Sequence, residues 1–235
     1  GCPERLNEHG AGYLAVVTML LRPPGVYRPQ DDTSLLIEVM HRREYASGRT
    51  VLDVGTGTGA VAIAAARAGA SSVTAVDLSL RSAIATWINS RLHRAPVTVH
   101  HGDLFAPLGG RRFELVLTNP PYVPSKNGML PRHRKGRSWD AGPDGRFLLD
   151  RICDAAPGVL ADDGLLLIVQ SELSGEDATL ARLAAGGLVA TVVARSHIPF
   201  GPVLRAREQM LRARGLLRPD QRDEQILVIE ARRSA

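Results

Sequence analysis

The stretch from Thr50 to Ala68 constrains the fold of this chain more than any other part of its sequence. It begins with a β-branched apolar run, passes through Gly55, Gly57 and Gly59, and ends in an alanine-rich run. This pattern predicts a strand, a tight turn in which glycine supplies a positive φ, and a helix. The order places backbone N–H groups at a helix N-terminus, where a ligand can approach closely. We therefore expect a nucleoside-binding α/β unit here.

An acidic residue ends the strand that we expect next along the chain. Residues 72–76 form another β-branched run, and Asp77 follows it. An acid about twenty residues after such a glycine turn can accept hydrogen bonds from ribose hydroxyls. Gly55, Gly57 and Ala60 also fit the G-x-G-x-x-G/A pattern of dinucleotide-binding proteins, so these residues alone do not separate a dinucleotide from another nucleoside.

Helical and strand patterns alternate along the rest of the chain. Helices are expected at 34–43, 60–68, 81–93, 147–160 and 176–185, and strands at 50–54, 72–76, 97–100, 113–118, 164–170, 188–194 and 226–230. This alternation predicts an α/β fold with a doubly wound sheet. One of Asp32, Thr33 and Ser34 is expected to cap the first helix.

The composition shows no break along the chain, so we expect a single domain at 22–235. The N-terminal extension at 1–21 is interpreted as non-native or dispensable, because Met19 offers a natural start; residues 1–18 are expected to be unnecessary for the fold and activity. Two segments interrupt the expected domain. One is a long basic loop at 123–146, which contains Trp139, and the other is an arginine-rich helical insertion at 199–220. Loops of this length inside compact domains are usually functional or mobile.

Composition and charge argue against several classes of protein. Cys2 and Cys153 are too few for a disulfide framework or a metal cluster, and they favour a reducing, cytoplasmic setting. His100 and His101 have no cysteine or aspartate at ligand spacing, so no metal site is expected. No apolar run approaches the roughly eighteen residues of a membrane span. The net charge of +5 is mostly arginine, which we attribute to a GC-rich genome rather than to a nucleic-acid surface.

The tetrapeptide Asn-Pro-Pro-Tyr follows the apolar run 113–118, which indicates a buried strand. Asn119 offers a side-chain carbonyl, and Pro120 has no N–H but keeps its backbone carbonyl. Two acceptors can hold the two hydrogens of one –NH2 group, while the Tyr122 ring covers the face of a planar substrate. The alternative is a strand that simply ends in a proline turn. Asp103 adds either an acceptor at the same edge of the sheet or a turn cap.

These motifs together resemble a known family, the class I S-adenosylmethionine-dependent methyltransferases that methylate amide or exocyclic amine nitrogens. The motifs that carry the resemblance are 51–59, Asp77, 102–104 and 119–122. The segments 26–33 and 139–146 resemble the release-factor glutamine methyltransferases in particular, in their short eukaryotic and archaeal branch. The resemblance spans residues 22–195 and implies a mostly parallel seven-stranded sheet with helices on both faces and an antiparallel last strand.

The resemblance implies S-adenosylmethionine as cofactor and S-adenosylhomocysteine as product. By this likeness, the glycines of the turn let the backbone approach the methionine part of the cofactor. Asp53 and Thr33 are implied to contact its amino-acid end, and Asp77 its ribose hydroxyls. Asp103 is implied to accept from the adenine amine, with the Leu104 backbone beside it.

The same resemblance implies that Asn119 and the Pro120 carbonyl orient the substrate nitrogen, that Tyr122 stacks on it, and that Asn119 also contacts the cofactor. The expected reaction is N5-methylation of an exposed glutamine in a protein, with a release factor as the target. The alternatives are a nucleic-acid adenine N6-methyltransferase, which the basic loop favours, and a natural-product N-methyltransferase. Two features depart from the family. The chain has no room for the N-terminal helical domain of the larger bacterial members, and the insertion at 199–220 has no counterpart.

Overall fold

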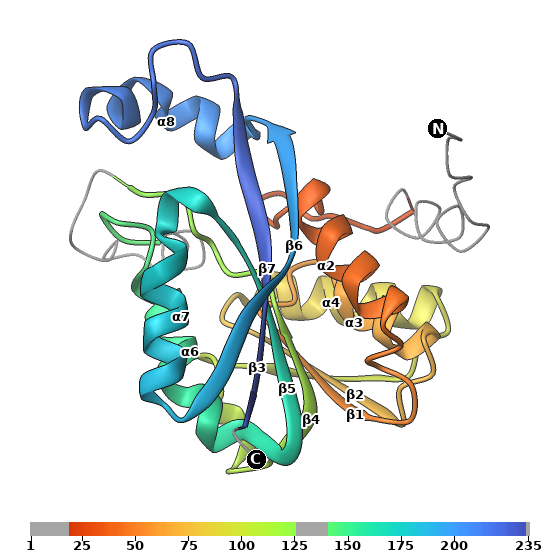
Figure 1. Cartoon of the computed structure of the whole chain (residues 1–235). Helices are drawn as coiled ribbons and strands as arrows, with labels where there is room; N and C mark the ends of the chain where they lie inside the picture. Colours follow the sequence, from red (N-terminus) through yellow and green to blue (C-terminus); the bar gives the residue numbers. More distant parts are fainter. Residues whose placement is uncertain (1–18, 126–140, 234–235) are drawn as a thin grey trace, which may run out of the picture.

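The computed structural model describes residues 19–125 and 141–233, and its centre is one sheet. The seven strands follow the order β3-β2-β1-β4-β5-β7-β6 (Figure 1). They are β1 (Thr50–Val54), β2 (Ser72–Asp77), β3 (Val97–His101), β4 (Phe113–Thr118), β5 (Leu160–Ser171), β6 (Leu188–Pro199) and β7 (Asp223–Arg233). Strands β1 to β5 pair in parallel, and β7 runs antiparallel between β5 and β6. The predicted sheet is therefore confirmed.

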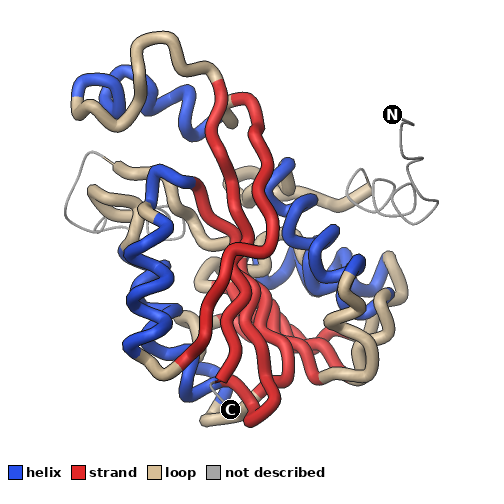
Figure 2. Tube along the Cα trace, viewed as in Figure 1, coloured by secondary structure: helices blue, strands red, loops and turns tan. Residues whose placement is uncertain are grey.

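Helices cover both faces of this sheet. They are α2 (Asp31–Arg42), α3 (Ala60–Arg67), α4 (Leu80–Leu92), α6 (Phe147–Val159), α7 (Glu176–Ala185) and α8 (Pro202–Ala213), with short 3-10 turns η1 (Ala106–Leu108) and η2 (Glu172–Ser174). Helices α2, α3 and α4 lie on one face, and α6 and α7 lie on the other (Figure 1, Figure 2). The strand order reverses between β1 and β4, and in open α/β sheets ligands bind at such a reversal, outside the carboxyl ends of the strands.

Each face of the sheet buries its own hydrophobic core, because side chains alternate along a strand. On β1, Leu52 belongs to the core that contains Leu149 of α6. Its neighbour Val51 belongs to the core that contains Leu36 of α2. All four side chains are completely buried. Burial on both faces fixes the strand register, since a slip of one residue would exchange the two sets of side chains. The ends of the central strands are thereby held in place.

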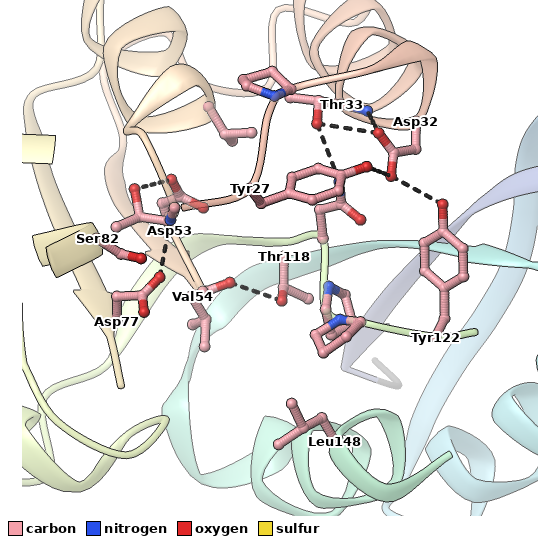
Figure 3. Close-up of a pocket in the computed structure, with 18 of the residues that line it drawn as sticks. Tyr27, Asp32, Thr33, Asp53, Val54, Asp77, Ser82, Thr118, Tyr122 and Leu148 are labelled. Carbon is pink, nitrogen blue, oxygen red and sulfur yellow. Dashed lines mark hydrogen bonds between the residues drawn. The ribbon is translucent and has the colours of Figure 1, made fainter. Parts of the chain in front are cut away.

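Helix α2 begins earlier than the sequence pattern indicates. The prediction is a helix from residue 34 capped by Asp32, Thr33 or Ser34, but the helix begins at Asp31, and its N-cap residue Gln30 makes no side-chain cap. The capping prediction is therefore wrong. Asp31 and Asp32 lie in the first turn, where carboxylates interact favourably with the helix dipole. Asp32 and Thr33 instead direct their side chains toward the end of β4 (Figure 3).

Strands β6 and β7 extend beyond their predicted ends. The sequence predicts strands at 188–194 and 226–230, whereas β6 continues to Pro199 and β7 begins at Asp223, and these two residues pair. Exposed residues alternate with less exposed ones over 195–199, and Arg195, Ser196 and His197 are polar, so no continuous apolar run marked the extra length. The longer hairpin carries α8, which accounts for much of the helical insertion expected at 199–220. Residues of α8 consequently line the cavity described below.

Leu21 is fastened to helix α4 by two hydrogen bonds. Its N–H donates to Asn89 Oδ1 at 2.8 Å, and Asn89 Nδ2 donates to the Leu21 carbonyl at 2.9 Å. We therefore propose that the domain begins before Leu21, a little earlier than the boundary at 22 drawn from the sequence. Residues 1–18 of the N-terminal extension and residues 126–140 of the basic loop, including Trp139, lie outside the described residues.

Candidate active site

A cavity of about 170 Å³ opens at the carboxyl ends of β1, β2 and β4 (Figure 3). It brings together the residues that the sequence predicts for the site, with one exception. Those that line it are Thr33, Asp53, Gly55, Gly57, Asp77, Asp103, Leu104, Asn119, Pro120 and Tyr122. Gly59 is buried behind the turn, where an added Cβ would lie 2.9 Å from Thr86 Cγ2 of α4. Its small size is therefore required by the packing of the turn against α4.

Gly55 and Gly57 expose backbone to the cavity. Their φ values are +74° and +60°, a left-handed region that glycine enters without strain. A Cβ added to either residue would meet no atom within 4 Å, so open space lies over both. The Gly55 and Thr56 N–H groups donate to the Val76 carbonyl at 2.8 and 3.1 Å, which ties the turn to the end of β2. The turn is thus rigid, and its outer side is open to a ligand.

Asp53 braces the turn from below. Its Oδ2 accepts hydrogen bonds from the Thr56 hydroxyl at 2.7 Å and from the Ala62 N–H at 3.1 Å. Burial raises the pKa of Asp53 to about 7, although these two donors act in the opposite direction. Only 2% of the residue is exposed. One oxygen is therefore used to hold the turn against the start of α3, and Oδ1 is the atom left for a ligand.

Asp77 ends β2 and holds the same turn from the side. Its Oδ2 accepts from the Gly57 N–H at 2.9 Å, and its Oδ1 accepts from the Ser79 N–H at 2.8 Å. Burial raises the pKa of Asp77 above its ordinary value, while these hydrogen bonds oppose the rise. The Ser82 side chain also hydrogen-bonds this carboxyl group. Two oxygens with two lone pairs each therefore leave Asp77 able to accept from one further donor.

Asp103 and Leu104 follow β3 at the far side of the cavity. Asp103 is half-exposed and forms an ion pair with Arg151 of α6 at 2.9 Å. Leu104 has a φ of +46°, which is uncommon for a residue other than glycine. Because a carboxylate can accept several hydrogen bonds, the arginine does not prevent Asp103 from binding a further donor.

Thr33 fixes the orientation of the Asn119 side chain. Asn119 Nδ2 donates to Thr33 Oγ1 at 3.1 Å, while the Thr33 hydroxyl donates to Asp32 Oδ1 at 3.2 Å. Because the threonine has used its only hydrogen on Asp32, it can only accept from Asn119. The amide nitrogen must therefore face Thr33, and Oδ1 is left as an acceptor. None of the described residues donates to this oxygen or to the neighbouring carbonyl of Pro120.

Asp32 organises the side of the cavity next to the tetrapeptide, a role that was not expected from the sequence. Its Oδ2 accepts from the hydroxyl of Tyr27 at 2.8 Å and from the hydroxyl of Tyr122 at 2.9 Å (Figure 3). Its Oδ1 accepts from the Thr33 N–H at 2.6 Å. Burial, together with the negative charge of Asp32, raises the pKa of both tyrosines. The sequence feature that could have indicated this role of Asp32 is the spacing of Tyr27, Asp32 and Thr33 in the segment 26–33, which resembles the family.

The chain behind Tyr122 is held by three separate elements. The Ser174 hydroxyl of η2 donates to the Tyr122 carbonyl at 2.9 Å. Gly145 lies so close that an added Cβ would be 2.2 Å from the same oxygen. Arg207 of α8 donates to the carbonyls of Val123 and Pro124. The tetrapeptide is therefore fixed on both its side-chain and its main-chain sides.

Comparison with known proteins identifies the family. The methyltransferase small domain family matches residues 18–130. A protein of Methanocaldococcus jannaschii assigned as a protein N5-glutamine methyltransferase is 32% identical over 177 residues, which cover 75% of this chain and 88% of that protein. The chain belongs to the protein N5-glutamine methyltransferase family. Membership identifies it as an S-adenosylmethionine-dependent methyltransferase, and it confirms the resemblance seen in the motifs.

Two further proteins are similar to this chain, one in sequence and one in fold. The release factor glutamine methyltransferase of Geobacter sulfurreducens is 34% identical over 151 residues, which cover 62% of this chain and 53% of that protein. This chain therefore matches about half the length of that relative. The E. cuniculi Mtq2–Trm112 complex, which methylates the translation termination factor eRF1, has a similar fold, with a TM-score of 0.63 and 24% identity. The likeness covers 89% of this chain and 99% of that one.

Two kinds of feature are absent from the described ranges, 19–125 and 141–233. These residues contain no group of three or more His, Cys, Asp or Glu side chains that could hold a metal ion. Their helices include none that is both long enough and apolar enough to cross a membrane.

Proposed function

We propose that this enzyme methylates the N5 side-chain nitrogen of a glutamine in a protein, and that the protein is a release factor. The observation that carries the proposal is the orientation of Asn119. Thr33 holds its amide so that Oδ1 is an acceptor, and the Pro120 carbonyl lies next to it in the chain. Two neighbouring acceptors match the two hydrogens of a carboxamide –NH2 group, and they match neither a carboxylate nor a carbonyl oxygen.

The open turn and the acidic residues around it fit S-adenosylmethionine. We infer that Gly55 and Gly57 make room for its methionine part and that Thr33 and Asp53 Oδ1 receive its amino-acid end. Asp77 is placed to accept from a ribose hydroxyl, because its carboxylate keeps a lone pair besides those used by Gly57, Ser79 and Ser82. Asp103 and the Leu104 backbone would receive the adenine. When bound, the cofactor supplies an electrophilic methyl group on a sulfonium.

The residues of the tetrapeptide would accelerate the transfer by orientation and by electrostatics. An amide nitrogen is a weak nucleophile because its lone pair is delocalised into the carbonyl. Asn119 Oδ1 and the Pro120 carbonyl would hold both N–H groups, so that the lone pair faces the methyl group; orientation of this kind lowers a barrier by up to about 7–11 kcal/mol. The same two oxygens would stabilise the positive charge that grows on nitrogen. Tyr122, anchored through its hydroxyl, would cover the planar amide.

A methyl-transfer assay tests this function. The purified enzyme is incubated with methyl-labelled S-adenosylmethionine and, in separate reactions, with a release factor, RNA, DNA and a whole-cell lysate. We expect label in the release factor, and mass spectrometry of its peptides should place one methyl group on a glutamine side chain. A release factor in which that glutamine is replaced by asparagine is the control. Label confined to RNA or DNA would instead make the enzyme an adenine methyltransferase and overturn the proposal.

A further inference from the structure

Glu224 is a buried carboxyl group beside the proposed substrate site. It lies at the start of β7, opposite Ile198 of β6, and it lines the same cavity as Asn119. Only 3% of the residue is exposed. The Ser171 hydroxyl hydrogen-bonds the carboxyl group, but Oε2 has no hydrogen-bond partner among the residues that the structure describes. Charged side chains are almost never buried in this way unless they are paired, so the group needs an explanation.

The carboxyl and phenol groups that interact with Glu224 do not supply the missing donor. Asp32 on α2 and Glu172 on η2 are carboxyl groups that repel it. The hydroxyl hydrogens of Tyr27 and Tyr122 are both used on Asp32. Every unused polar atom that these residues present is therefore an acceptor.

The one cationic side chain that lines this cavity within the described ranges is committed to the backbone. Arg207 donates to the carbonyls of Val123 and Pro124, and no ion pair between Arg207 and Glu224 occurs in the described part of the chain. A ligand group that reaches Glu224 Oε2 must therefore be a hydrogen-bond donor. A peptide does so through its main-chain N–H groups, whereas a base or a phosphate offers few or none.

We propose that Glu224 is a substrate-binding residue, whose Oε2 accepts a hydrogen bond from a main-chain N–H of the peptide segment that carries the target glutamine. The proposal rests on the proposed function, because it takes the methyl acceptor to be a protein. Asn119 and Pro120 would select the side-chain amide, and Glu224 would select the extended peptide attached to it. The carboxyl group is left without a donor in the free protein so that the substrate can provide one.

The test compares Glu224 with its neighbour on the same strand. Glu224→Met keeps the volume and removes the acceptor, Glu224→Gln restores an acceptor without charge, and Asp223→Asn removes a charge from an exposed side chain one residue away. Each purified variant is assayed with a release factor at saturating S-adenosylmethionine. Cofactor affinity is measured by calorimetry, and the melting temperature is recorded at pH 8.

We expect Glu224→Met to raise KM for the release factor by about 10- to 100-fold, as loss of a hydrogen bond to a charged group predicts. Glu224→Gln should lie between this variant and the wild type, and Asp223→Asn should behave as the wild type. Cofactor affinity should change less than about twofold in all of them. The melting temperature of Glu224→Met at pH 8 should not fall, because a buried carboxyl group with one oxygen lacking a partner has been removed.

Two results would overturn the inference. One is an unchanged KM in Glu224→Met. The other is a loss of activity that accompanies a lower melting temperature and weaker cofactor binding, in both Glu224→Met and Glu224→Gln, since that pattern marks a structural role. Failure of the proposed function would be seen with the wild-type enzyme alone. In that case the wild-type enzyme would transfer the labelled methyl group to an atom other than a glutamine side-chain nitrogen. The variants would then be compared on the acceptor labelled in the lysate.

Discussion

The side-chain amide of Asn119 donates a 3.1 Å hydrogen bond to the hydroxyl of Thr33, which lies 86 residues earlier in the chain. This contact joins the first turn of α2 to the end of β4, and it decides which way the asparagine amide faces. Thr33 is itself held by Asp32, so the orientation is set by a chain of hydrogen bonds rather than by one contact. The first prediction tests this arrangement.

Replacing Asn119 with alanine should lower the rate of methyl transfer by about 10²- to 10³-fold, as loss of one transition-state contact does elsewhere. Cofactor affinity should stay within a few-fold. Asn119→Asp should be as inactive as alanine, because aspartate cannot donate to Thr33 and would place a second negative charge near Asp32. Single-turnover kinetics and calorimetry measure the two quantities. A fully active Asn119→Ala enzyme would remove the tetrapeptide from the mechanism.

Thr33→Val should reduce the rate by about tenfold, because the valine has no oxygen to accept from the Asn119 amide. Thr33→Ser is the matched control, since it keeps the hydroxyl group, and it should retain most of the activity. The ratio of the two rates at saturating substrate measures the contribution of the hydroxyl. Equal rates for valine and serine would show that the amide is oriented by something else.

Asp77→Ala should weaken binding of S-adenosylmethionine by about 10- to 150-fold, the effect of losing a hydrogen bond to a charged acceptor. The rate at saturating cofactor should change much less, because a ribose contact is equally strong in the ground and transition states. The melting temperature should also fall, since Asp77 holds the Gly57 N–H. Asp162→Ala, at an exposed carboxylate of β5, is the control. An unchanged dissociation constant in Asp77→Ala would contradict the assignment.

Arg207→Ala should reduce kcat with a release factor while leaving cofactor affinity unchanged. The arginine holds the two carbonyls that follow Tyr122, so its loss should loosen the tetrapeptide without disturbing the glycine turn. Arg205→Ala on the exposed side of α8 removes the same charge and should be nearly neutral. If both variants lose activity equally and recover it at low salt, the role of α8 is electrostatic attraction of the substrate.

The pH dependence of stability should reveal Glu224. Burial raises its pKa from 4.5 to about 7 in the folded protein, and Asp32 and Glu172 add to the rise. A carboxyl group whose pKa is higher in the folded state stabilises the fold below the unfolded pKa and loses this contribution as pH rises through the folded pKa. Stability of the wild type should therefore decrease between about pH 4.5 and pH 7, partly through Glu224.

Comparison with Glu224→Gln isolates this residue. Asp53, whose pKa is also raised to about 7, titrates in the same direction in both proteins and cancels in the difference. At pH 8 the glutamine variant should be more stable than the wild type by up to about 3 kcal/mol, and at pH 4 the two should be nearly equal. Urea unfolding at the two pH values measures the difference. A constant difference between pH 4 and pH 8 would show that Glu224 keeps its ordinary pKa.

Local patterns in the sequence were sufficient for the main architecture. Asp53, the glycine turn and Asp77 belong to short segments whose meaning depends on neighbours within a few residues, and each segment forms the element that its pattern predicts. The order of these segments then limits a parallel sheet to few topologies, because crossover connections are right-handed. Asn119 could also be placed from the sequence. It follows a recognisable strand, and the carboxyl ends of parallel strands lie at the same edge of the sheet.

Contacts between distant segments were decided only by the tertiary structure. Asp32 meets Tyr122 across 90 residues, and whether a polar residue near a helix start caps the helix or turns toward the sheet depends on what packs beside it. Glu224 precedes the strand expected at 226–230, and it is buried because β7 pairs with β6 beyond the length that its apolar run indicates. Strand register and helix placement come from the burial of the whole core, a property of all the contacts together, and no short stretch of sequence contains it.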